Sequence, residues 1–348
     1  MLSRRTSAAG FLTAAAAASL ITGCSSGGGS TADADGVTHI TAASQSNPTG
    51  FSLWLAEELG YFDEAELDVE IQYAENGGAL LASGAAGDWQ AGWIGAPPLL
   101  TGYDSWGLLP TGSMLTENKN IILFMDNDVL DGSSPAEALA STPVGVVANS
   151  VSAQLLFACA DSLGVEASDI ETVPLDPAAI VNGMLNDDID AGVAFAAGNW
   201  PLVEDPDKYA QVCDGDKAGA QLIDPYMITP AFWSENPDAA AAYLDAVYRA
   251  NEYILDTPQE EVTPHLMDFL DSIGADFPEE VAEYSLSVKN YFTLDEALEQ
   301  MRSGAFSDGL TDTAEFLVDA GVYDEMPDIE AMTAEGIDVL QAAADYRN

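Results

Sequence analysis

The sequence predicts an α/β protein with two lobes, followed by a helical C-terminal region. Three observations favour this fold class. Apolar residues make up 48% of the 348 residues, which is enough for packed cores and too much for a wholly disordered chain. Short apolar runs alternate with stretches of helical spacing up to residue 236, which is typical of lobes with largely parallel sheets. From Pro237 onward the pattern is almost entirely helical.

The first lobe begins at Val37, and its strands and helices alternate as far as residue 126. Val69 and Ile71 alternate with polar residues, as in a half-buried strand. Gly60 supplies a stop for the preceding helix. The strands that we expect here are residues 37–43, 67–73, 90–95 and 120–125. The helices that we expect here are residues 51–59, 79–86 and 99–106.

The same alternation begins again after Asp126. Asn149 and Ser150 lead into an apolar helix that ends near Gly164. The second lobe is expected to hold strands at residues 143–147, 170–175 and 191–195, and further helices at 134–140 and 180–186. The C-terminal helices are expected at residues 237–255, 279–288, 294–302 and 311–320.

The charge of the chain excludes several classes of partner. It carries 58 Asp and Glu against 9 Lys and Arg, a formal net charge of −49. No basic stripe is present for nucleic acid, and no polybasic face for anionic lipid headgroups. Two histidines and three cysteines leave little for a zinc site, so we expect no metal and no cofactor. Salt screens such a charge, so we expect the protein to come from a saline habitat. The alternative is an ordinary acidic secreted protein.

Residues 1–23 have the pattern of an export signal. Arg4 and Arg5 precede an alanine-rich apolar stretch, residues 8–21, that is too short to span a bilayer comfortably. The Leu-Ile-Thr-Gly-Cys run that ends at Cys24 resembles a lipobox, in which the cysteine is lipidated and becomes the first residue of the mature protein. We therefore expect an exported protein that lipidated Cys24 anchors to the outer face of the cytoplasmic membrane.

Residues 24–36 are rich in glycine and serine and predict a flexible tether. The Ser3-Arg4-Arg5 run also resembles a twin-arginine signal, but the usual Phe-Leu does not follow, so the Sec and Tat routes both stay open. An uncleaved membrane anchor or a buried helix is the alternative interpretation of the apolar stretch.

Two further cysteines, Cys159 and Cys213, follow Cys24. An exported compartment is oxidising and permits a disulfide between them, but their spacing alone does not establish one. Two buried free thiols are the alternative. A catalytic thiol needs a nearby base. Since only His39 and His265 are available, we expect no catalytic residue of this kind.

An ordered set of short motifs resembles one family, the substrate-binding proteins of ABC transporters in the nitrate, sulfonate, taurine and thiamine-pyrimidine (NMT1-like) group. The resemblance covers roughly residues 37 to 345. It departs from the family at Glu66, Gln90 and Asp188, which are turn and surface positions. The motifs that carry it are Leu55 to Phe62, Leu67 to Glu70, Leu81 to Gly84, Asp190-Ala191, Asn236 to Asp238, Thr313 to Leu317 and Gly321 to Tyr323.

This resemblance implies a two-lobed periplasmic-binding-protein-like fold (type II), with a ligand cleft between the lobes. Lobe one is then expected to comprise residues 37–126 plus 224–348, and lobe two residues 127–223. The helical tail would pack on lobe one. Open α/β sheets bind ligands at the carboxyl ends of their strands, which agrees with such a cleft.

Three junctions between a strand and a helix are expected to face the cleft: residues 44–51, 95–97 and 149–152. Helix N-termini present free N–H groups, so two that face each other can hold an anionic head without arginine. Ser150 and Ser152 have an alternative role, because they can cap their helix without touching a ligand. The candidate ligand-binding residues at these junctions are Ser44, Asn47, Ala96, Pro97, Asn149, Ser150 and Ser152.

Further candidates come from a glycine turn and from aromatic residues. Asn76 and Gly77 offer an amide and a close backbone approach, or form an ordinary turn. Trp54, Phe195 and Trp200 could wall the ligand or belong to the core, and Asn199 is a further polar contact.

No basic residue marks the pocket in the sequence. Lys119, the one cation of lobe one before the crossover, is expected in an exposed turn. The charge of the ligand therefore stays open, and acidic residues with a tryptophan could hold a cation.

The leading functional hypothesis is a lipid-anchored protein, not an enzyme and expected to be monomeric, that delivers a small solute to an ABC permease and its ATPase. Sulfonates, nitrate and pyrimidine-like compounds are the candidate solutes that the resemblance implies. An enzyme of the same fold related to pyrimidine synthesis is one alternative, which would require a reactive lysine and histidines in the cleft. A sensor domain for a membrane partner is the other.

Overall fold

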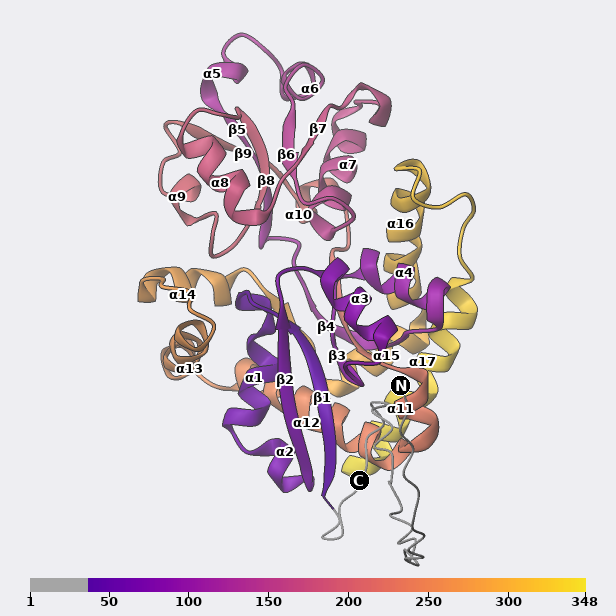
Figure 1. The fold of residues 1–348 in the computed structure, drawn as a ribbon. Coiled ribbons are helices and arrows are strands. Elements are labelled where there is room, and N and C mark those ends of the chain that lie inside the picture. Colours follow the sequence, from indigo (N-terminus) through magenta and orange to yellow (C-terminus); the bar gives the residue numbers. More distant parts are fainter. Residues whose placement is uncertain (1–36) are drawn as a thin grey trace, which may run out of the picture.

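The structure is a computed structural model that describes residues 37–348, which form two sheets surrounded by helices (Figure 1). The six-stranded sheet has the order β11-β4-β10-β3-β1-β2, and the five-stranded sheet has the order β7-β6-β8-β5-β9. We call each sheet with its packed helices a lobe. The first sheet comprises β1 (Thr38–Gln45), β2 (Leu67–Ala74), β3 (Ala91–Trp93), β4 (Leu109–Thr116), β10 (Ile223–Ile228) and β11 (Asn290–Tyr291). The second comprises β5 (Ile121–Asp126), β6 (Val144–Val146), β7 (Thr172–Pro174), β8 (Ala191–Phe195) and β9 (Tyr209–Asp214).

Both sheets are mixed, so the expectation of largely parallel sheets was wrong. In the first sheet β1 runs parallel to β2 and β3, whereas β10 runs antiparallel to β3 and β4. In the second, β6 runs parallel to β7 and β8, but β5 runs antiparallel to β8 and β9. The antiparallel strands are those by which the chain passes directly from one sheet to the other. Helical crossovers make β1, β2 and β3 parallel, whereas a strand that returns directly from the other sheet need not follow their direction.

The chain passes from the first sheet to the second between Thr116 and Ile121, and returns between Asp214 and Ile223. The outward passage lies earlier than the expected crossover near residue 127, because β5 pairs with β8 and β9 rather than with the first sheet. The return lies close to the expected residue 224.

Helices cover both sheets. Those before the outward passage are η1 (Pro48–Gly50), α1 (Phe51–Glu58), α2 (Tyr61–Glu64), α3 (Gly77–Ala86) and α4 (Ala96–Trp106). The second lobe holds α5 (Asn127–Leu130), α6 (Pro135–Leu139), α7 (Val151–Leu163), η2 (Ala167–Asp169), α8 (Pro177–Leu185), α9 (Trp200–Val203) and α10 (Gly215–Ala218). The C-terminal region holds α11 (Pro230–Glu235), α12 (Pro237–Asp256), α13 (Gln259–Ser272), α14 (Glu279–Ser287), α15 (Leu294–Ser303), α16 (Ala305–Asp319) and α17 (Ile329–Arg347).

The C-terminal helices pack mainly on the first sheet, with α12 and α17 against β4 and against each other. The buried Tyr248 hydroxyl of α12 donates to the carbonyl oxygens of Thr111 and Ser113 in β4, at 2.9 and 3.3 Å. Because these two carbonyl oxygens and the Tyr248 hydroxyl are paired with each other, the contact holds the helix to the strand at little desolvation cost.

Two features fasten the second lobe. A disulfide joins Cys159 of α7 to Cys213 of β9, with their Cα atoms 6.0 Å apart. Across the lobes, Gln154 Nε2 of α7 donates to Thr313 Oγ1 of α16 at 3.0 Å. Phe157 and Phe316 of the same two helices pack with their ring centroids 5.6 Å apart, and Figure 1 shows α16 rising beside α7.

Among residues 37–348, no helix combines the length and apolarity needed to cross a membrane. Cys24, the expected signal and the tether lie outside the described residues.

Candidate functional site: a polar cluster between the lobes

A cluster of buried polar side chains lies where the chain passes between the two sheets. Glu117 and Asn120 belong to the outward passage, Asp224 is the second residue of β10 after the return, and Lys289 follows α14. The exposed fractions are 2% for Glu117, 0% for Asn120, 2% for Asp224 and 9% for Lys289. Ionisable groups are rarely buried to this extent without partners, so the contacts of each one matter.

Hydrogen bonds connect three segments of this cluster. Thr49 Oγ1, in η1, donates to Glu117 Oε1 at 2.7 Å. Lys289 Nζ donates to Asn120 Oδ1 and to Ser285 Oγ, each at 3.1 Å. The lysine is therefore hydrogen-bonded to neutral oxygens, while Glu117 accepts from a hydroxyl.

The electrostatics of the cluster favour fewer charges than the residue types suggest. Burial, together with the neighbouring Glu117 carboxyl, raises the pKa of Asp224 well above its ordinary value, and Lys289 opposes that rise. Burial lowers the pKa of Lys289, and the two carboxyl groups oppose that fall. Low-dielectric surroundings penalise each charged form, which explains both directions.

Two of the three junctions expected at the cleft come together beside Asp224. Gly95 precedes α4, and Val151 begins α7 in the other lobe. A Cβ placed on Gly95 would lie 3.3 Å from Asp224 Oδ1 and 3.6 Å from Val151 Cγ1. The Asp224 carboxyl thus lies beside the N-terminus of α4, close to the first residue of α7. The remaining junction reaches the cluster through Thr49.

The predicted residues of the second lobe lie at the same interface. The Trp200 ring packs on Tyr284 of α14, in the first lobe, with ring centroids 5.1 Å apart. Asn199 is fully buried, and its Nδ2 contacts the carbonyl oxygens of Asn120 and Ala194 at 3.5 and 3.4 Å. Phe195 ends β8 and pairs with Ile121 at the start of β5.

The predicted serines of α7 are engaged within their own turn. Ser150 is the N-cap: its Oγ accepts from the Ser152 N–H at 3.1 Å and donates to the Val147 carbonyl at 2.8 Å. Ser152 Oγ accepts from the Val147 N–H at 3.1 Å and is fully buried. Asn149 takes a left-handed conformation with φ of 51°. The geometry therefore favours the capping interpretation of these serines.

The predicted residues of the first lobe also have local roles. Ser44 Oγ accepts from Trp93 Nε1 at 2.9 Å. Asn47 and Asn76 cap η1 and α3, accepting from the Thr49 and Ala79 N–H groups at 2.9 and 3.0 Å. The remaining three candidates shape the start of two helices. Ala96 and Pro97 are buried at the start of α4, and a Cβ on Gly77 would lie 2.7 Å from Pro98 Cγ.

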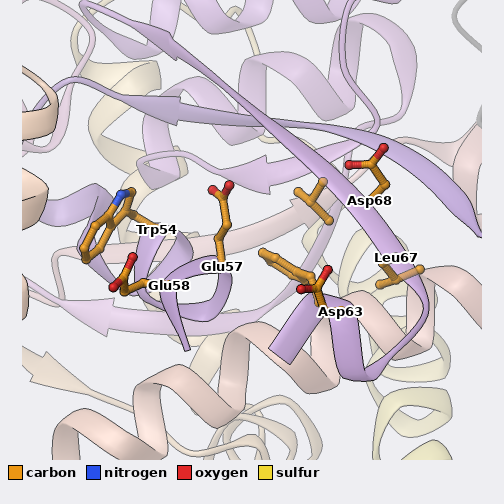
Figure 2. Close-up of a pocket in the computed structure, with 8 residues that line it drawn as sticks. Trp54, Glu57, Glu58, Asp63, Leu67 and Asp68 are labelled. Carbon is orange, nitrogen blue, oxygen red and sulfur yellow. The ribbon is translucent and has the colours of Figure 1, made fainter. Parts of the chain in front are cut away.

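Trp54 belongs to a different part of the first lobe. Its ring packs 5.7 Å from that of Phe269 in α13, and it lines a pocket of about 390 Å³ between α1, α2 and β2. Figure 2 shows this outer pocket, where four carboxylate side chains gather. The structure does not bring Trp54 together with the polar cluster. The residues that line the outer pocket are Trp54, Glu57, Glu58, Phe62, Asp63, Leu67, Asp68 and Val69.

Sequence reasoning missed the cation of the cluster. Lys119 is exposed, as expected, and lies 3.6 Å from Asp216, whereas Lys289 is buried. One signal was available: apart from Asn290, the neighbours of Lys289 are the apolar Val288 and Tyr291-Phe292, an unusual setting for a lysine in so acidic a chain. Among residues 37–348, no group of three His, Cys, Asp or Glu side chains is arranged to hold a metal ion.

The architecture defines the class of protein: two α/β lobes with a polar site at their junction, as in periplasmic binding proteins. The sequence profile described as NMT1/THI5 like matches residues 47–261, and the chain belongs to this family. No curated protein sequence matches the chain significantly.

Solved structures share the fold at low sequence identity. The periplasmic aliphatic sulphonate-binding protein SsuA from Escherichia coli is 15% identical, with a TM-score of 0.68 over 84% of this chain and 90% of that one. The periplasmic nitrate-binding protein NrtA from Synechocystis PCC 6803 is 17% identical, with a TM-score of 0.65 over 89% of each chain. A Candida albicans protein described as having the generic periplasmic binding protein fold is 15% identical, with a TM-score of 0.61 over 86% and 95%.

Proposed function

We propose that this protein is a lipid-anchored, extracytoplasmic solute-binding protein that captures a small solute between its lobes and delivers it to an ABC importer. The observation that carries this proposal is the buried polar cluster at the passages between the lobes. Buried polar groups that converge from several segments are typical of a ligand site. The names of SsuA and NrtA, which describe sulphonate and nitrate binding, support the same class of function.

The mechanism that we propose is closure of the lobes around the solute. The passages at residues 117–120 and 215–222 connect the sheets, and a few residues in such connections can absorb a hinge rotation. Contacts between Trp200 and Tyr284 and between Gln154 and Thr313 join the lobes at their surfaces. A solute that contacts both lobes favours the closed arrangement, because it binds that arrangement more tightly.

An enzyme of the same fold remains the alternative, and the arrangement of the histidines favours binding over catalysis. His39 lies 2.6 Å from Asp68, on the side of the outer pocket. His265 packs edge-on against Tyr253 in α12, with ring centroids 5.9 Å apart. Neither contact belongs to the polar cluster around Lys289. The other alternative is a sensor domain for a membrane partner. Genes for a permease and an ATPase beside the gene for this protein would favour transport over sensing.

A thermal-shift screen combined with small-angle scattering tests the binding function. We expect at least one small sulfonate, nitrate or pyrimidine-like solute, or a small cation, to raise the melting temperature, since a ligand of the folded state stabilises it. The same solute should reduce the radius of gyration as the lobes close. A full panel that changes neither quantity would contradict the proposal.

The lipid anchor needs a separate test in cells. Replacing Cys24→Ala removes the expected attachment site, and we expect the protein to be released from the membrane fraction or to remain unprocessed. Ser26→Ala is a matched control, because it lies in the expected tether and leaves Cys24 in place, so it should not alter fractionation. Unchanged processing and fractionation of the Cys24 variant would contradict lipidation.

A further inference from the structure

Resting on the proposed binding function, we propose that the solute presents a positively charged group, such as an ammonium or amidinium, to the carboxyl groups of Glu117 and Asp224. The cluster holds two buried carboxyl groups and one buried lysine. The lysine donates to Asn120 and Ser285, so its two hydrogen bonds are to neutral oxygens rather than to a carboxylate. A second cation at the carboxyl groups would take the place of the proton that burial and the hydrogen bond to Glu117 favour on Asp224.

The position of Asp224 argues against an anionic solute at this place. Its Oδ1 lies beside Gly95 at the N-terminus of α4, with Val151 at the start of α7 close by. An anion drawn to these two helix N-termini would meet a carboxyl group that the chain itself supplies. An ionised Asp224 repels an anion at these helix termini, whereas a cation stabilises the ionised form, so a cation fits this place better.

An unused donor in the cluster points independently to a ligand. Asn120 is fully buried, and its Oδ1 accepts from Lys289. Its Nδ2, on the same amide group, has no hydrogen-bond partner among the residues that the structure describes. A buried donor without a partner is costly. A solute that carries an acceptor oxygen or nitrogen near its cationic group would satisfy this donor.

Binding of a cation at this place should release a proton. Burial and Glu117 favour the protonated form of Asp224 by raising its pKa, and an arriving positive charge favours the ionised form. The other titratable groups around the pair are Lys289, Tyr226 and Tyr291. Burial raises the pKa of both tyrosines, so both stay neutral and add no charge to the pair.

Calorimetric titration with three molecules of the same shape and different charge tests the inference. The probes are acetamidinium chloride, acetamide and sodium acetate, all at one ionic strength because the chain is so acidic. We expect saturable binding of acetamidinium alone. Its affinity should rise with pH, and titrations in two buffers of different ionisation enthalpy should reveal proton release. Tighter binding of acetate than of acetamidinium would overturn the inference and leave the solute-binding function standing.

Variants locate the site. Asp224→Asn should weaken acetamidinium binding roughly tenfold or more and abolish proton release. Glu58→Gln is the matched control, because Glu58 lines the outer pocket and should change neither quantity. Equal affinity of the parent and Asp224→Asn proteins would overturn the inference. If Asp224→Asn does not fold, the pH dependence of the parent decides: an affinity that is flat with pH also overturns it. Failure of the wider solute screen would instead contradict the binding function itself.

Discussion

Two groups of acidic side chains in the first lobe have similar composition and opposite surroundings. In the outer pocket, Glu57, Glu58, Asp63 and Asp68 line the wall together with Trp54 and remain accessible to water (Figure 2). In the cluster between the lobes, Glu117 and Asp224 are almost fully buried beside Lys289. Burial, and to a lesser extent repulsion by Glu58, Asp63 and Asp68, raises the pKa of Glu57. Burial and Glu117 raise the pKa of Asp224 well above its ordinary value.

The comparison shows that exposure to solvent, rather than the number of carboxyl groups, determines the charge state and the interactions of an acidic group in this protein. Exposed carboxylates keep their charge and are screened by salt, so they interact weakly. Buried carboxyl groups must find a counter-charge, a hydrogen-bond donor or a proton. Among residues 37–348 of this strongly acidic chain, the buried pair of Glu117 and Asp224 therefore has a specific need that a solute can meet.

The largest expected effect comes from removing the buried cation. Lys289→Met leaves two buried carboxyl groups without compensation and removes the donor to Asn120 and Ser285. We expect a loss of roughly 3–5 kcal/mol in the free energy of unfolding, measured by urea denaturation. Lys119→Met is the control, since that lysine is exposed, and should cost no more than about 0.5 kcal/mol. Equal losses in the two variants would remove the distinction between buried and exposed charge.

The disulfide provides a comparison of similar size away from both acidic groups. Its cysteines are separated by 54 residues, and a loop of that length gives an upper value of about 4 kcal/mol from chain entropy. We expect the double variant Cys159→Ala/Cys213→Ala to lose about 2–4 kcal/mol, measured without reductant. A parent protein whose melting temperature does not change with reductant would show that the bridge is not formed in solution.

The pH dependence of stability should separate Asp224 from the exposed acids. Its raised pKa favours the protonated native state, so this contribution is complete below the ordinary value of 3.8 and is lost as pH rises through the raised value. The stability of the parent relative to Asp224→Asn should therefore decline as pH rises above the ordinary value. Denaturation of both proteins over a series of pH values checks this, and a constant difference would contradict the assignment.

A smaller effect is expected at the start of α7. Because the Ser150 hydroxyl already caps the helix, Ser150→Ala should lower the free energy of unfolding by about 1 kcal/mol. Ser152→Ala should also destabilise the fold, because the Val147 N–H loses its hydrogen-bond acceptor. The affinity for a confirmed solute should be unchanged in both. Weaker binding by a fully folded variant would instead place these serines at the ligand.

The smallest effect belongs to the outer pocket. Glu58→Gln should change the free energy of unfolding by no more than about 0.5 kcal/mol.

The whole protein, by contrast, should melt at higher temperature as salt increases, because screening reduces repulsion across the acidic surface. A melting temperature that does not vary with salt would contradict this view of the surface.

Much of the fold was predictable because local patterns specify it. The alternation around Val69 predicted β2, and Ser150 before an apolar run predicted the start of α7. The strands β4 and β10 were missed. Both are buried on both faces and therefore do not alternate, and β4 contains Pro110 and Gly112. Those residues are rare in strands, so the pattern gave no signal.

The site was only partly predictable. The three junctions between strands and helices were identified from local turn chemistry, and Asn199 and Trp200 lie at the interface between the lobes. The charged residues Glu117, Asp224 and Lys289 were not predicted. They come from segments far apart in the sequence, which only the folded arrangement of the two sheets brings together. Burial of a single lysine or aspartate depends on tertiary packing and has no periodic signature.

The order of strands in the first sheet also constrains the route by which the protein folds. β10 lies between β3 and β4, although the whole second sheet separates it from them in the chain. Until β10 has been synthesised, β3 and β4 lack the strand that lies between them. Their exposed edges can then pair with a wrong strand or with another copy of the chain. The second sheet is built from one continuous segment, residues 121–214, and can form by itself. We expect it to fold first, and the first lobe to close around β10 afterwards, as the slow step dominated by distant contacts.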